Sequence, residues 1–373
     1  EQYHANGRIT EMKLRELERT HRRRLAACFL LIVVTGVVFL SYAVVTLFQD
    51  RASEDDYWEK SFTETDSLNQ ELAQRSRSAV PVEIGTYIEN LKEVSIKTSS
   101  FRAVMLVWFK WEGENDLDMM NHFKVYKGTV NKLEMVKDYH SGAENYQLAR
   151  ADISVTKNYW TRRFPLESHQ LRVYLESSYP VEQVVLKADN ENSGYNPNLD
   201  IAGYELRRYG TDVCTIKYDN NHSDPEINKN VMTNEFMTEI ELNRSDWGLY
   251  VKCFIALFGT STWVLIVLFL NTYHHVDPLS MIPAALFGTV SNIMVGANLL
   301  PDALEVGLLE YVNIWGIFTI LAVTISVINV NRIRSKFEDR DFAKFFGRVM
   351  FYSIITLTLL GHVLMPLSAY MFR

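Results

Sequence analysis

The sequence of 373 residues is 47% hydrophobic and 22% charged, with a formal net charge of −7. This composition excludes a disordered chain, a collagen and a low-complexity array. The acidic balance argues against a nucleic-acid partner, because it supplies no overall attraction for phosphate. The three cysteines exclude a disulfide-dense scaffold and a four-cysteine zinc site.

Long windows without Asp, Glu, Lys or Arg are the strongest local signal. Roughly 20 apolar residues in a helix cross a hydrocarbon core about 30 Å thick. Every window exceeds that length, so each is predicted to be a membrane span. The first is too long for a cleaved signal peptide, which favours an uncleaved anchor. The five windows are residues 25–49, 253–276, 278–301, 311–331 and 349–372.

Basic flanking segments predict the orientation. Residues 1–26 and the loop 332–348 each carry a net charge of +3, whereas residues 50–247 carry −11. Short loops rich in Lys and Arg remain cytoplasmic. The N-terminus is therefore expected in the cytoplasm and residues 50–247 outside.

The segment between the first and second spans contains two different sequence patterns. Residues 53–79 read as a helix that begins with acidic residues. From Val80 onward, short alternating strands are separated by loops rich in Asn, Asp and Gly, as at 189–198 and 219–230. This second pattern predicts an antiparallel β-sandwich.

Catalytic and metal-binding patterns are missing from the sequence. It contains no C-x-x-C, Gly-rich phosphate loop, H-E-x-x-H or nucleophile elbow. The pair His274–His275 reads more simply as a solvated turn than as a metal site. We therefore predict no enzyme, no catalytic residue, no cofactor and no metal centre.

One segment of the outer domain is specific, the run from Trp160 to Leu171 that contains Phe164, Pro165, Glu167 and His169. It resembles the signature loop of pentameric ligand-gated ion channels, the Cys-loop receptor family. Glu167 stands where the family has Asp and His169 where it has Gln, and the flanking cysteines are absent, as in prokaryotic members.

Further segments resemble the same family in the same order over about residues 80–370. They are the strand pair at 82–90 and 101–111, the stretch 199–206, Arg244 before the second span, the run 298–301 and the run 311–315. The resemblance implies an outer β-sandwich and a four-helix transmembrane bundle. The first span and residues 53–79 lie outside the family pattern, so the charge-free window adds an N-terminal transmembrane helix to it. The domains are then a cytoplasmic helix (1–26), a transmembrane helix (27–49), a helical linker (50–80), a ligand-binding-like β-sandwich (81–247) and the pore domain (248–373).

The resemblance makes the third span the pore-lining helix of a homopentamer. Steps of four and three residues place one set of side chains on a single stripe. Small and hydroxyl residues with one large aromatic suit a water path with a hydrophobic constriction at Phe287. The stripe comprises Ser280, Ala284, Phe287, Ser291, Met294 and Asn298. Asp277 at the cytoplasmic mouth would form a ring that favours inorganic cations, and it also fits a helix N-cap before Pro278.

Coupling between the domains is expected at the signature loop. The resemblance places Phe164, Pro165 and Glu167 at the membrane-facing end of the sandwich, with Arg244 as the ion-pair partner of Glu167. The loop that begins at Pro301 would receive their movement. The small ligand is unknown, and the candidate aromatic residues by position are Tyr126, Tyr179 and Tyr218.

Two functions fit these observations. The first is a ligand-gated-type ion channel, cation-permeable and gated by the outer domain, in a bacterial inner membrane. The second is a non-conducting pentameric receptor or scaffold subunit, which Pro283 and the bulky Phe287 and Met294 favour. Residues 9–26 continue the first span inward as an anchor among lipid headgroups, or as a helix that docks a protein partner or modulates gating.

Overall fold

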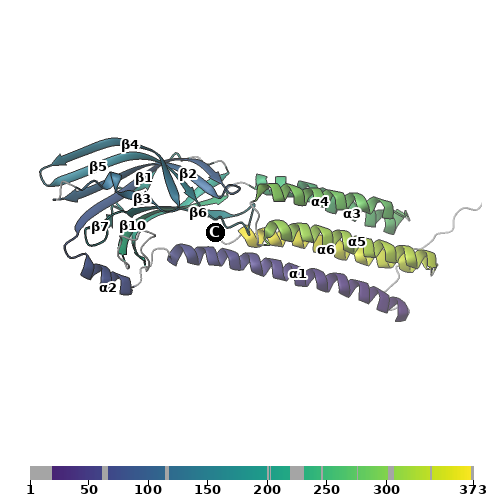
Figure 1. The fold of residues 1–373 in the computed structure, drawn as a ribbon. Coiled ribbons are helices and arrows are strands. Elements are labelled where there is room, and N and C mark those ends of the chain that lie inside the picture. Colours follow the sequence, from purple (N-terminus) through teal and green to yellow (C-terminus); the bar gives the residue numbers. More distant parts are fainter. Residues whose placement is uncertain are drawn as a thin grey trace, which may run out of the picture.

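The chain forms an elongated molecule with a β-rich domain at one end and long parallel helices at the other (Figure 1). The computed structural model describes residues 19–60, 66–113, 117–199, 201, 203–218, 231–244, 247–274, 276–300, 306–336 and 338–370. Only the backbone is described at residues 66–70, 295 and 297.

The β-rich domain contains two sheets within the described residues. The first has the order β4-β5-β2-β1-β7 with β8 paired to β1, and the second has the order β3-β6-β10-β9. Most pairs are antiparallel, while β7 and β8 run parallel to β1. The strands are β1 (Val80–Ser95), β2 (Ser100–Glu112), β3 (Phe123–Val125), β4 (Gly128–Ser141), β5 (Glu144–Thr156), β6 (Ser168–Ser177), β7 (Val184–Ala188), β8 (Gly194–Tyr195), β9 (Tyr204–Tyr218) and β10 (Val231–Arg244).

One buried apolar cluster draws side chains from both sheets. Alternation along β6 directs Leu171, Val173 and Leu175 into this cluster, where they meet Phe236 and Ile240 of β10. The opposite face of β10 is also buried, although it is lined by acidic side chains such as Glu235, Glu239 and Glu241. The strand β10 is therefore buried on both faces.

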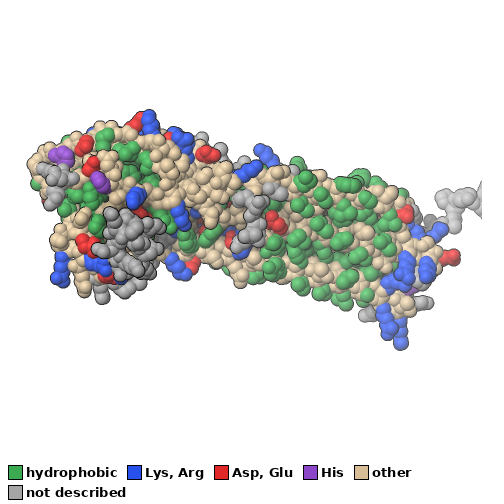
Figure 2. Space-filling view, in the orientation of Figure 1, with side chains coloured by type: hydrophobic (Ala, Val, Ile, Leu, Met, Phe, Trp, Pro, Cys, Tyr) green, Lys and Arg blue, Asp and Glu red, His purple; other side chains and the backbone are tan. Residues whose placement is uncertain are grey.

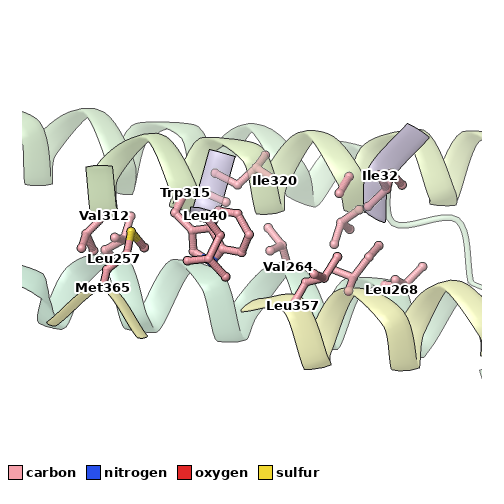
Figure 3. Close-up of a cluster of buried hydrophobic side chains, with 14 of the residues drawn as sticks. Ile32, Leu40, Leu257, Val264, Leu268, Val312, Trp315, Ile320, Leu357 and Met365 are labelled. Carbon is pink, nitrogen blue, oxygen red and sulfur yellow. The ribbon is translucent and has the colours of Figure 1, made fainter. Parts of the chain in front are cut away.

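The helices are α1 (Arg19–Lys60), α2 (Asp66–Arg75), α3 (Gly248–His274), α4 (Ile282–Leu299), α5 (Leu308–Lys336) and α6 (Arg340–Tyr370), with 3₁₀ turns at Met119–Asn121 and Leu279–Met281. Within the described residues, α1, α3, α5 and α6 are long and apolar enough to span a membrane, as an integral membrane protein requires. Side chains from all four meet in one cluster (Figure 3).

Five spans were expected, and the third differs from the expectation. The window 278–301 does not form one long helix, because a 3₁₀ turn occupies Leu279–Met281 and α4 begins only at Ile282. Pro283 lies in the first turn of α4, where its missing N–H group costs nothing. The 18 residues of α4 rise about 27 Å, slightly less than a hydrocarbon core.

The N-terminal helix also differs from the expectation. The predicted boundary at residue 49 falls inside α1, which continues without a break to Lys60. The helix predicted over 53–79 overlaps the end of α1 and all of α2, and residues 61–65 lie outside the described part of the chain. The buried residues of α1 recur every three or four positions along one stripe, which continues from Leu47 through Arg51 and Glu54 to Trp58. In Figure 1, α1 runs beside α6 and reaches the β-rich domain.

Candidate functional site

The residues of the run from Trp160 that precede β6, here called the signature segment, form a turn between β5 and β6 that contacts the helices. Phe164 and Leu166 are 3% and 4% exposed and belong to the same buried cluster as the helix bundle. The Phe164–Pro165 peptide bond is cis. The segment therefore inserts apolar side chains of the outer domain into the end of the bundle.

The predicted ion pair between Glu167 and Arg244 is present. Arg244 Nη2 lies 2.6 Å from Glu167 Oε1, and the Glu167 side chain is fully buried. Tyr204 donates its hydroxyl to the same carboxylate oxygen at 3.0 Å, and the guanidinium of Arg244 lies 4.0 Å from the centre of the Tyr204 ring. A backbone hydrogen bond from Arg244 to the Glu167 carbonyl joins the two segments again.

His169 completes this buried cluster. Its Nε2 lies 3.4 Å from Glu167 Oε1 and 3.1 Å from the Tyr204 hydroxyl. Burial opposes ionisation of Glu167, but His169 and the positive charge of Arg244 outweigh it and lower the pKa of Glu167 to about 2. The carboxylate is therefore charged at neutral pH.

A second contact joins the signature segment to α5. The Leu308 amide donates to the Arg162 carbonyl at 2.7 Å. A Cβ atom on Gly307 would lie 2.3 Å from that same carbonyl oxygen, so only glycine permits this approach. Pro301, predicted to receive the movement of the outer domain, lies outside the described residues.

Acidic residues of α1 form a cluster with the signature segment that the sequence analysis missed. Asp50 lies 3.4 Å from Arg162 and 3.2 Å from Arg163. Glu54, which is 2% exposed, pairs with Arg163 and accepts the Ser168 hydroxyl at 2.7 Å. Burial and the charge of Arg51 lower the pKa of Arg163 to about 10, which leaves it protonated at neutral pH.

A signal for this cluster exists in the sequence. Arg51 and Glu54 continue the three-and-four spacing of the apolar stripe that passes through Ala43 and Leu47. Charged residues in register with a buried stripe require charged partners, because an unpaired buried charge is costly. The division into a transmembrane helix (27–49) and a helical linker (50–80) concealed this register.

The predicted pore stripe lies on one exposed face of α4, apart from Ser280, which belongs to the 3₁₀ turn before it. Phe287 is 75% exposed and Met294 is 63% exposed, and Ser280, Ala284, Ser291 and Asn298 are exposed as well. The opposite face packs on the bundle through Ile282, Ala285 and Thr289. There the Asn292 amide donates to Asn313 Oδ1 of α5 at 2.8 Å.

Asp277 lies just before α4 and is exposed. Its carboxylate accepts the Leu279 amide at 3.3 Å and the Asn331 side-chain amide at 2.8 Å. The predicted N-cap role for α4 is wrong, because Met281 holds the N-cap position and makes no side-chain bond there. Asp277 instead accepts from the 3₁₀ turn and from α5.

A cavity of about 790 Å³ lies on the outer domain and is partly walled by α1. Of the three predicted ligand tyrosines, Tyr126 lines this cavity, together with Tyr57 of α1, Trp160 and Tyr174. Tyr179 instead stacks on His122 with ring centres 4.9 Å apart, and Tyr218 donates to Glu176 at 3.1 Å. The volume suits a small organic ligand.

The cavity contains charged groups of both signs. Glu235, 3% exposed, has a carboxylate oxygen without a hydrogen-bond partner among the described residues. Burial and the nearby negative charge of Glu176 raise the pKa of Glu235 to about 7. Lys127, Lys157 and Arg172 also line the cavity, so its charge alone does not select a cation or an anion.

Comparison with known protein families and with curated proteins finds no match to this chain.

Proposed function

We propose that this chain is a subunit of a homopentameric ligand-gated-type ion channel that conducts inorganic cations and is gated by its outer domain. Five copies of α4 would surround the axis, and the two sheets of the outer domain would form the β-sandwich of the Cys-loop receptor family. A small ligand acting on the outer domain, with Tyr126, Tyr179 and Tyr218 as candidate contacts, would change the arrangement of the helices.

The exposed stripe of α4 is the observation that carries this proposal. Ser291 and Asn298 contribute polar side chains to it, and Ser280 extends it into the 3₁₀ turn before α4. Lipid tails offer no hydrogen bonds, so polar groups at this depth are more stable beside water or protein. The exposed face of α1 is mostly apolar, with Leu30, Val34 and Val38 among its exposed residues, although Thr35 and Ser41 are exposed there too. The polar stripe of α4 suits a water path, and the mostly apolar face of α1 suits lipid.

Phe287 supplies a gate within this path. Five phenylalanine side chains at one level would make a narrow apolar constriction, which excludes water until the helices rotate or tilt. Leu286, Val290 and Ile293, exposed beside the stripe, would then pack against the α4 helices of neighbouring subunits.

The distribution of charge supports the proposed orientation. Lys and Arg side chains gather at the end of the helices opposite to the β-rich domain, and a broad hydrophobic band separates the two (Figure 2). By the positive-inside rule, the basic end would face the cytoplasm and the β-rich domain would lie outside, as in a bacterial inner membrane.

Reconstitution tests the proposal. We expect the purified chain to form pentamers by native mass spectrometry and to carry current in planar bilayers. With NaCl at unequal concentrations, the reversal potential should lie near the Na⁺ equilibrium value. A value near the Cl⁻ equilibrium value would contradict cation selectivity, and a different oligomeric state would contradict the channel architecture.

A non-conducting pentamer is the second candidate, and the bulk of Phe287 and Met294 on the α4 stripe favours it. Cysteine substitution separates the two functions. In a channel, Ser291→Cys should react with a water-soluble thiol reagent and the reaction should block current. Pentamers without current, in which Ser291→Cys stays unreactive, would establish the scaffold.

A further inference from the structure

The helix α1 touches both sides of the boundary between the outer domain and the bundle. From Asp50 onward this helix leaves the bundle and lies against the signature segment and β6 (Figure 1). Within the bundle the same helix packs on α5. Phe39 stacks with Trp315 at 6.0 Å between ring centres, Tyr42 meets Tyr311 edge-on, and Gly36 lies against Phe318.

Two acidic residues of α1 contact the signature segment and the start of β6. Glu54 Oε2 receives the Ser168 hydroxyl at 2.7 Å and pairs with Arg163, while the Glu54 carbonyl accepts the Gln170 amide at 2.9 Å. Asp50, one helical turn earlier, holds Arg163 and Arg162. All four partners belong to the signature segment or to the first residues of β6.

Those partners lie next to two contacts at the boundary between the outer domain and the bundle. They are the Glu167–Arg244 ion pair and the Arg162–Leu308 hydrogen bond. Ser168 follows Glu167, whose ion pair with Arg244 lies at the end of β10, shortly before α3. Arg162, held by Asp50, accepts the Leu308 amide at the start of α5. A displacement of α1 along its axis would therefore move both contacts at once.

Because the contacts of Asp50 and Glu54 with the signature segment are buried, they are sensitive to the loss of a single charge. The side chains of Arg163 and Glu54 are 3% and 2% exposed. Removing the charge of Glu54 leaves Asp50 as the acidic partner of Arg163, so positive charge is in excess in a buried cluster, which is unfavourable. Exposed pairs on the same helix, such as Asp56 with Lys60, contribute far less.

We propose that Asp50 and Glu54 of α1 are positioning residues for gating. They hold the signature segment in the register that the Glu167–Arg244 pair and the Arg162–Leu308 hydrogen bond require. The N-terminal helix is then a gating element of each subunit as well as an anchor. This inference rests on the proposed channel function.

Hydrogen–deuterium exchange tests the positioning role without current. In full-length protein in lipid nanodiscs, Glu54→Gln and Asp50→Asn should each accelerate amide exchange about tenfold in residues 161–168 and 306–310. Asp56→Asn is the matched control, because it removes the same charge from the exposed side of α1. If both variants show the wild-type exchange rate in residues 161–168 and 306–310, the proposal is overturned. If Glu54→Gln does not assemble, Asp50→Asn alone decides.

Single-channel recording tests the gating role. Glu54→Gln should change the open probability at least about threefold while the unit conductance stays at the wild-type value, because Glu54 is far from the α4 stripe. Glu54→Asp should recover part of the effect, since it keeps the charge. Unchanged open probability in both Glu54→Gln and Asp50→Asn would overturn the gating role. A wild type that carries no current contradicts the proposed function instead, and the exchange result then still decides whether α1 positions the segment.

Discussion

Glu167 Oε1 and Arg244 Nη2 lie 2.6 Å apart and join segments that are 77 residues distant in sequence. The pair occupies the boundary between the two parts of the molecule, with Glu167 just before β6 and Arg244 at the end of β10. Its side chains are 0% and 11% exposed, so water cannot replace either partner at low cost. The pair therefore fixes the geometry of this boundary, and a change in it would move β6 and β10 together.

Substitution within this pair should be strongly non-additive. Glu167→Gln and Arg244→Gln should each lower the free energy of unfolding by about 3–5 kcal/mol, because each leaves one charge buried without its partner. The double variant should lose clearly less than the sum of the two. Thermal unfolding of the purified protein measures the cycle. Losses that simply add would contradict a direct interaction.

Gly307→Ala should disturb the contact between the signature segment and α5. The new Cβ would lie 2.3 Å from the Arg162 carbonyl oxygen, a backbone atom that cannot move alone. The melting temperature should fall by several degrees, and amide exchange near Leu308 should accelerate. Gly259→Ala is the control, because in α3 no atom lies within 4 Å of the new Cβ, and alanine there should be neutral or stabilising. Equal melting temperatures for the two variants would contradict the close approach.

The coarse architecture could be predicted from the sequence because its signals are local. Charge-free windows located the helices α1, α3, α5 and α6, and alternation predicted the β-rich middle of the chain. The helix ends were less predictable. Pro283 fits only the first turn of a helix, so α4 begins later than the third window does. The helix α1 continues from apolar into charged residues without a break.

The site was predictable only where a motif marked it. The Glu167–Arg244 pair followed from the resemblance of the signature segment, whereas the contacts of Asp50 and Glu54 depend on where α1 lies in space. Spacing along one helix shows which residues share a face, but it does not identify what that face meets. The partner of Glu54 is 109 residues away in sequence, on a turn whose position the tertiary fold determines.

The stability of the outer domain should depend on Glu235. Its pKa is raised to about 7 in the folded protein by burial and by Glu176, against about 4.3 in an unfolded chain. The unfolded state therefore releases its proton first, and stability falls as the pH rises from about 4 to above 7, by about 4 kcal/mol in total. Glu235→Gln stays neutral, so it should raise the melting temperature at pH 8 and give little change at pH 4.5. The exposed Glu112→Gln is the control. An advantage of Glu235→Gln that is equal at both pH values would contradict this account.

Phe287→Ala should relieve the proposed constriction. Alanine widens the stripe at the one position where α4 exposes a large aromatic side chain, which is 75% exposed in the single chain. Spontaneous current in planar bilayers should increase several-fold, because a wider constriction stays wet. Leu359→Ala, which shortens a side chain of α6 that is 60% exposed, is the control and should leave spontaneous current near the wild-type level. An equal increase in both variants would point to a general loosening of the helices.

Asp277→Asn should weaken cation selectivity. The substitution removes five charges from the proposed cytoplasmic mouth while it keeps a side-chain oxygen that can accept the Asn331 amide, as Asp277 does at 2.8 Å. A ring of negative charge raises the local concentration of cations and repels anions, so its loss should move the reversal potential toward the Cl⁻ equilibrium value. The shift should be larger at low ionic strength, since the Debye length grows from about 8 Å to about 30 Å between 0.15 M and 0.01 M salt. Asp341→Asn removes the same charge from the first turn of α6, away from the α4 stripe, and serves as the control. Equal reversal potentials for the two variants in dilute salt would show that the ring does not select the ion, and selectivity would then have to come from the acidic outer domain.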